Sequence, residues 1–170
     1  MLTSYVFNFF GLKNIEKLSL TRYCLAAFVV DFFPAILIFY IASRLINSDL
    51  IGWSFRSEIH IGIVDLFGLT LLAPLMETCM LSGVVYFVSK IFETKINTAL
   101  MTAFVFACFH GLISPIWFLG TFWPFFVFSF AYISWFPQSF KNAFISACVP
   151  HSLHNLTVFI LLYNSKLSGA

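Results

Sequence analysis

The sequence contains very few charged residues for its length. Asp, Glu, Lys and Arg make up 9% of the 170 residues, whereas a soluble domain carries about 25%. Hydrophobic residues account for 61% of the chain, and its mean hydropathy is +0.96. A soluble fold of this size would have too little polar surface to cover so much apolar area. The composition therefore excludes a soluble globular protein and predicts an integral membrane protein.

Several other features are also missing. The chain has no cluster of Lys and Arg of the kind that binds nucleic acid, and its formal net charge is only +2. It has no C-x-x-C pair, so we interpret its four cysteines as small buried hydrophobes. Residues 1–10 lack the basic start of a cleavable signal peptide, and no internal repeat is present. We therefore expect one integral membrane domain over residues 1–170, with no nucleic-acid partner.

Long apolar segments predict the membrane helices, since a spanning helix needs about 20 mostly apolar residues. The segments expected to be helical in the membrane are 24–46, 75–92, 98–113, 116–135 and 143–163. Apolar residues recur every three or four positions in residues 12–23, which predicts an interfacial helix before the first span. The predicted fold is all-α: a polytopic transmembrane helical bundle of five to six membrane helices plus this N-terminal interfacial helix.

Two prolines are expected to break apolar segments, because proline removes a backbone donor and clashes with the preceding turn. Residues 60–92 are too long for one straight span. Pro74 should divide them into a short or re-entrant helix over 60–72 and a spanning helix over 75–92. Pro124 should interrupt the aromatic segment 116–135 in the same way.

Basic residues predict the orientation in the membrane. Six of the nine Lys and Arg fall in three places: before the first span, around the polar loop near residue 93, and in the turn near residue 140. These residues are Lys13, Lys17, Arg22, Lys90, Lys95 and Lys141. If the three places share the cytoplasmic side, the N-terminus lies inside and the C-terminus outside. A separate crossing by residues 60–72 would place the N-terminus outside.

A few ionisable side chains lie inside the apolar segments, where each is a candidate functional group. They are Asp31, Asp65, Glu77, His110, His151 and His154, with Asn155 beside the last two. Measured from the lysine that ends each segment, at 1.5 Å per residue, Glu77 lies roughly 20 Å deep and His110 roughly 22 Å. His151 and Asn155 lie roughly 15 and 21 Å deep. Three helices therefore bring polar groups to one level.

Polar groups in membrane helices also serve as hydrogen-bonding glue between helices. Asp31 and Asp65 have no partner at a matching spacing, so we interpret them as structural. His151 and Asn155 are four residues apart and share a helix face, and His154 lies within about a third of a turn of it. The Phe106 ring, four residues before His110, can shield that histidine from lipid or from the neighbouring helix. If these polar side chains only held helices together by hydrogen bonds, they would lie at scattered depths. Their similar depth therefore favours a shared functional site.

Three short motifs occur in order along these segments. E-T-C-M-L-S begins at Glu77, F-A-C-F-H spans Phe106 to His110, and H-S-L-H-N spans His151 to Asn155. In spacing and helical context they resemble the E-E-x-x-x-R, F-x-x-x-H and H-x-x-x-N/D motifs of the CPBP family. These are the CAAX-prenyl-endopeptidase and bacteriocin-processing intramembrane proteases, also called Abi proteins. The resemblance covers residues 60–163, a family-like catalytic core.

The resemblance implies an intramembrane endopeptidase that hydrolyses a peptide bond of a membrane-associated substrate. Glu77 would activate a water molecule, and His110 would assist as a base. His151 and Asn155 would stabilise the oxyanion in a dry site, with Phe106 and His154 in support. The resemblance implies no cofactor, a peptide or protein substrate at the lipid bilayer, and a multi-pass location in the cell membrane, in keeping with a bacterial inner-membrane protein.

The first motif departs from the family pattern at two positions. Thr78 replaces the second Glu, and Ser82 replaces the Arg. Four residues apart, a Glu and an Arg there could form an ion pair along one helix face. Because both charges are absent together, no uncompensated charge is left, and the two hydroxyls can bond to backbone carbonyls one turn back. Thr78 and Ser82 are therefore predicted to support Glu77 in place of an ion pair.

Other functions fit some of the same residues. Glu, two His and Asn are legitimate Zn²⁺ ligands, although their spacing matches no standard zinc motif. The loss of the Glu and Arg also suits a catalytically inactive relative that acts as a binding or bacteriocin-immunity factor. A transporter would need further polar residues along a path to both faces, and residues 116–135 contain no charged side chain.

Overall fold

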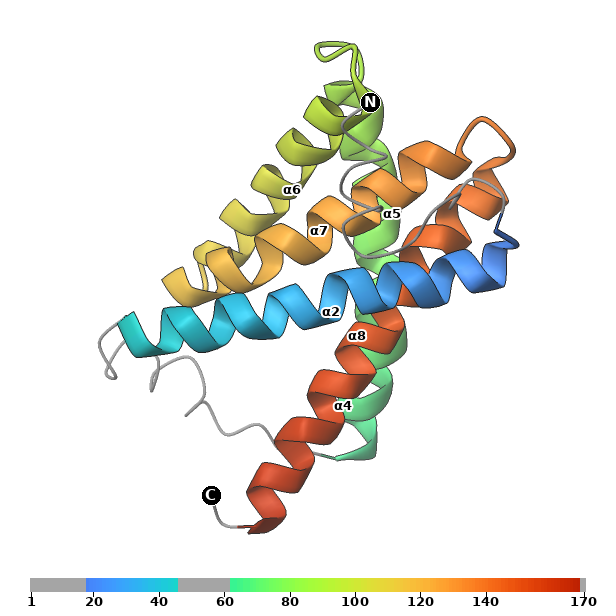
Figure 1. Ribbon diagram of the computed structural model, residues 1–170. Coiled ribbons are helices and arrows are strands. Elements are labelled where there is room, and N and C mark those ends of the chain that lie inside the picture. The colour runs from blue at the N-terminus through green and yellow to red at the C-terminus, as the bar shows by residue number, and fades with distance from the viewer. Residues whose placement is uncertain (1–17, 46–61, 169–170) are drawn as a thin grey trace.

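The structure is a computed structural model that describes residues 18–45 and 62–168, and these residues form helices with short connections (Figure 1). The elements are α2 (Leu20–Leu45), α4 (Ile63–Phe67), the π-helical turn η2 (Gly68–Leu72), α5 (Ala73–Val88), α6 (Lys95–Gly111), α7 (Pro115–Trp135) and α8 (Phe140–Ser168). The described ranges contain no strand. The predicted all-α transmembrane fold is confirmed.

The predicted number of membrane helices was too high. Within the described ranges, four helices are long and apolar enough to cross a membrane: Leu20–Ala42, Ile63–Val88, Pro115–Trp135 and Phe140–Asn164. α6 is not among these four, and its 17 residues lie at the lower end of the roughly 17–25 that can span a bilayer. Residues 12–17, half of the predicted interfacial helix, lie outside the described residues; its last four residues form the first turn of α2, and the two before them are not helical.

The prediction that Pro74 divides its segment was wrong. α4, η2 and α5 follow one another without interruption, so residues 63–88 form one candidate span. Pro74 follows η2 inside this continuous helix, where its ring removes one backbone donor. The wider π-helical turn immediately before it takes up the distortion that the ring would otherwise cause.

Pro124 does not interrupt its segment either, because α7 runs unbroken from Pro115 to Trp135. Membrane helices tolerate proline where neighbouring helices hold the backbone. Pro124 itself is buried, and the adjacent Trp123 Nε1 donates a hydrogen bond to the Val30 carbonyl oxygen of α2 at 2.9 Å. Neighbouring helices therefore cover α7 at this point.

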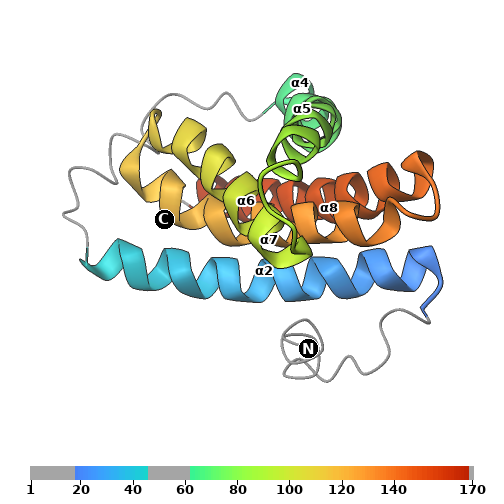
Figure 2. The same cartoon turned by 90° about the horizontal axis from the view of Figure 1, so that it is seen from above.

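α7 is the central helix of the bundle. It packs against α2, α6 and α8, while α5 packs chiefly on α8, η2 and α6. Seen from above, α2 lies on one side of α7, and α4 and α5 lie on the other (Figure 2). Aromatic side chains fill these contacts: Phe106 of α6 stacks on Phe125 of α7 at 4.4 Å between ring centroids. The buried core therefore follows the aromatic segment of the sequence.

The connections that carry basic residues gather at one end of the bundle. The start of α2, the α5–α6 connection and the α7–α8 connection lie along the upper and right side of Figure 1. The end of α2, the start of α4, the α6–α7 connection and the end of α8 lie along the opposite side. Because α4 continues into α5, it makes no separate crossing. This arrangement agrees with a shared side for the basic connections, and the orientation in the membrane stays a prediction.

Candidate intramembrane site

The carboxylate of Glu77 on α5 lies against the imidazole of His151 on α8. Glu77 Oε2 and His151 Nε2 are 3.5 Å apart, with side-chain exposures of 26% and 6%. This separation is longer than the roughly 2.8 Å of a charge-assisted hydrogen bond, so the two groups are adjacent without being tightly bonded. Glu77 therefore keeps acceptor capacity for a further ligand such as a water molecule.

Aromatic rings of α7 enclose the imidazole of His151. The Phe128 ring is stacked on it, with 4.7 Å between centroids and 18° between planes. The Phe125 ring meets it edge-on at 5.5 Å. These rings exclude water from one side of His151, and electrostatic interactions are stronger in such surroundings than in water. The Glu77 side, which is partly exposed, remains the open side of the site.

His110, at the end of α6, also packs against Phe125. Its ring is 5.3 Å from the Phe125 ring, and it interacts electrostatically with Glu77. His110 Nδ1 lies 2.9 Å from the carbonyl oxygen of Phe106. A ring nitrogen bonded to a carbonyl must carry the proton, so Nε2 of the neutral ring is left as an acceptor. The His110 tautomer therefore suits a base. The Phe106 ring packs on Phe125, as described above.

Asn155 lies on the same face of α8 as His151 and contacts η2. Its Nδ2 donates a hydrogen bond to the Leu69 carbonyl oxygen in η2 at 2.9 Å. The four-residue spacing therefore does place His151 and Asn155 on one face, opposite η2 and α5. The amide has a second N–H, since only one of its two protons is used in this bond.

His154 turns away from this group toward α2. Its Nδ1 lies 2.7 Å from Asp31 Oδ2, and Asp31 is fully buried. The rings of Phe32 and Phe128 flank His154 edge-on at 5.6 and 6.5 Å. The three-residue offset from His151 accounts for the different direction. Sequence reasoning missed this partner for Asp31, because it lies 123 residues away and no local spacing indicates it.

The residues that replace the motif Glu and Arg face α7 and α8. Thr78 is buried and interacts with the Cys148 thiol of α8. Ser82 Oγ donates to the Cys79 carbonyl oxygen at 2.7 Å, as predicted for a hydroxyl at this position, and also interacts with the Tyr132 side chain. These contacts hold the face of α5 that neighbours Glu77 against the bundle.

Asp65 has a structural role, as the sequence analysis expected. Its Oδ2 accepts a hydrogen bond from the Gly62 backbone N–H at 2.9 Å and closes the first turn of α4. A carboxylate in the first helical turn also interacts favourably with the helix dipole. Asp65 is therefore a helix cap and stands apart from the Glu77 group.

The structure also bears on metal binding and on cavities. In the part of the chain that the structure describes, no group of three or more His, Cys, Asp or Glu lies close enough together to hold a metal ion.

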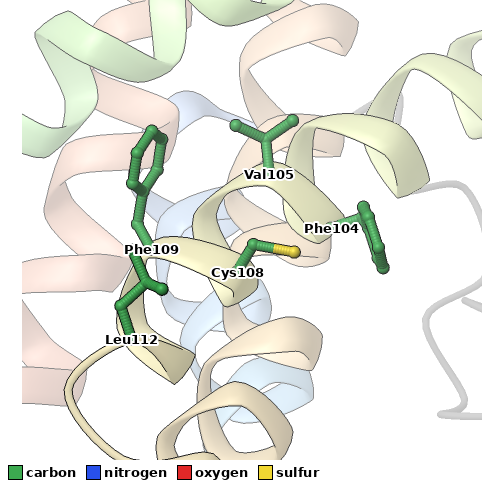
Figure 3. A pocket seen from close by; sticks show the side chains of 5 residues that line it. All are labelled: Phe104, Val105, Cys108, Phe109 and Leu112. Atoms are coloured by element: carbon green, nitrogen blue, oxygen red, sulfur yellow. The ribbon is translucent and has the colours of Figure 1, made fainter.

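A shallow cavity of about 240 Å³ lies on α6, lined by Phe104, Val105, Cys108, Phe109 and Leu112 (Figure 3). These side chains are apolar or sulfur-bearing and do not belong to the Glu77 group.

No family model, curated protein or solved structure matches this chain. Function therefore has to be inferred from the contacts of the residues themselves. The structure brings Glu77 and His151 into contact and packs His110 against the Phe125 ring, which also contacts His151. It bonds Asn155 to the backbone of η2 and pairs His154 with α2.

Proposed function

We propose that the chain is an intramembrane endopeptidase of the glutamic, CPBP-like type. The observation that supports this most is the contact between Glu77 and His151, two ionisable groups from different helices inside apolar segments. Ionisable groups at such positions are costly and are commonly functional. A partly exposed carboxylate beside an imidazole that aromatic rings enclose suits the activation of a water molecule.

In the proposed reaction, the Glu77 carboxylate accepts a proton as water attacks the carbonyl carbon of the scissile peptide. His110 Nε2, the free acceptor of its ring, assists as a second base. The negative oxygen that forms is stabilised by N–H groups of His151 and Asn155. When the C–N bond breaks, the proton passes to the leaving amine, which gives one new carboxyl end and one new amino end.

The substrate in this proposal is a peptide or protein segment that reaches the site from the membrane. The groups lie within apolar segments, so a lipid-associated chain could approach them without leaving the bilayer. Because its three motifs resemble those of the CPBP family, the proposal places the chain in that family and in the cell membrane of a bacterium.

One expected result follows from the use of water as the nucleophile. Membranes are purified from cells that express the chain and are incubated in H₂¹⁸O. Membrane-protein fragments that form there should carry one ¹⁸O atom at each new carboxyl end. A covalent acyl-enzyme that exchanges with an added amine would instead give an amide product. Mass spectrometry of the fragments measures both outcomes. The absence of any new terminus relative to membranes without the chain would overturn the proposed activity.

The zinc alternative predicts a different response to chelation. A catalytic zinc site has three protein ligands, whereas among the described residues no third His, Cys, Asp or Glu lies close enough to Glu77 and His151 to complete one. We therefore expect the cleavage rate to stay within about twofold after treatment with a strong chelator, measured on the fragments described above. Loss of cleavage that added Zn²⁺ restores would show that the site uses metal.

One observation favours the non-enzymatic alternative, a binding or bacteriocin-immunity factor. The Asn155 amide is already bonded to a backbone carbonyl, so half of its donor capacity serves the fold. A protein that had kept these residues only for packing would show the same contact. In that case, the biological effect of the chain would not depend on the Glu77 carboxylate, which the Glu77 variant in the Discussion tests.

A further inference from the structure

The π-helical turn leaves one backbone carbonyl without a donor from its own helix. In an α-helix, the Leu69 carbonyl oxygen would accept from the Ala73 N–H, four residues later. Here the Ala73 N–H donates to Gly68, five residues back. The five-residue pattern would pair Leu69 with Pro74, which has no N–H. Neither of the two helical donors is therefore available to the Leu69 carbonyl.

Asn155 supplies the missing donor from the neighbouring helix. Its Nδ2 lies 2.9 Å from the Leu69 carbonyl oxygen. An unsatisfied carbonyl at membrane depth is costly, because lipid chains offer it no hydrogen-bond donor. Side chains from adjacent helices are one of the means by which membrane helices satisfy the groups that a proline leaves free. The Asn155 amide thus replaces the hydrogen bond that Pro74 cannot make.

The turn that this bond completes also sets the direction of Glu77. A π-helical turn adds one residue to the helical repeat, and each residue turns an α-helix by about 100°. Residues after η2, Glu77 among them, are therefore rotated by about that angle relative to α4 compared with an uninterrupted α-helix. Without the turn, α4 and Glu77 could not both keep their present faces.

We propose that Asn155 is a positioning residue. By bonding the Leu69 carbonyl it holds the π-helical turn before Pro74 and so aims Glu77 at His151. This inference rests on the proposed function only where it treats Glu77 as the catalytic base. It adds a role to the oxyanion contact implied for Asn155, because one amide N–H serves Leu69 and the other remains for substrate.

A double-mutant cycle between Asn155 and Pro74 tests the inference. Ala at position 74 restores a backbone N–H that can serve the Leu69 carbonyl, so the Asn155 amide is no longer needed there. Asn155→Leu should lower the ratio of folded to unfolded protein roughly threefold to tenfold in the wild-type chain. In the Pro74→Ala background the same change should have almost no effect. Equal losses in the two backgrounds, measured by denaturant titration in bicelles, would overturn the inference.

A second measurement addresses the aim of Glu77. We expect Asn155→Leu to shift the ¹⁵N resonance of His151 Nε2, because Glu77 Oε2 would move from its position 3.5 Å away. Asn97→Leu is the matched control, since Asn97 is exposed in the first turn of α6, where its backbone N–H donates to the Thr94 hydroxyl oxygen. An unchanged His151 resonance in Asn155→Leu would contradict the positioning role. Both readouts are independent of proteolysis, so they still decide the role of Asn155 if no cleavage is found.

Discussion

Glu77→Gln is expected to lower kcat/KM for peptide cleavage by about a hundredfold to ten-thousandfold, the range that a general base contributes. The amide has nearly the same shape as the carboxylate, but it cannot accept the proton of the attacking water. Because Glu77 is partly exposed and is not tightly bonded to His151, the change should leave the fold nearly as stable as before. The measurement is the rate of fragment formation in proteoliposomes that contain equal amounts of each variant.

Glu93→Gln provides the matched control. Glu93 lies exposed in the connection between α5 and α6, and the substitution removes one carboxylate far along the chain from the site. It should cleave at the wild-type rate. If Glu77→Gln cleaves as fast as this control, Glu77 is not the base. If cells carrying Glu77→Gln keep the full biological effect of the chain, the binding alternative is favoured over proteolysis.

Some features of the site could be predicted because they depend on short spacings. The four-residue interval between His151 and Asn155 puts both on one helix face. In the structure His151 contacts α5 and Asn155 contacts η2. The distances along each helix from the terminal lysines gave similar depths for Glu77 and the residues of α8. The contact between Glu77 and His151 agrees with that estimate of depth. Helical geometry alone was sufficient for these features.

Other features depend on tertiary contacts that no local pattern contains. Pro74 looked like a break, because the effect of proline on an isolated helix is to disrupt it. The structure keeps the helix continuous by means of η2 and an amide from a helix 86 residues away in sequence. The direction of His154 depends likewise on the packing of α2 against α8. Local periodicity predicted where helices run, but not which helices touch.

The pair formed by the buried Asp31 and His154 should contribute strongly to stability. Within the described ranges, Asp31 Oδ1 is buried and has no hydrogen-bond partner, so the bond from Oδ2 to His154 is the one the carboxyl group has. His154→Leu removes that partner and leaves the whole carboxyl group buried and unbonded, at a cost of about 3–5 kcal/mol. Asp31→Leu leaves a neutral imidazole with one unpaired N–H, which costs about 1–3 kcal/mol.

The order of these losses distinguishes a buried pair from two independent contacts. We expect His154→Leu to be the more damaging single change, and the double variant Asp31→Leu/His154→Leu to be more stable than His154→Leu alone, because an apolar pair leaves no unbonded polar group. Glu93→Leu, which removes an exposed carboxylate, should stay within about 0.5 kcal/mol of the wild-type chain. Denaturant titration in bicelles gives the free energy of unfolding of the wild-type chain and of each of the four variants. Additive losses from Asp31 and His154 would mean that the two side chains stabilise the bundle separately, through packing and not through their bond.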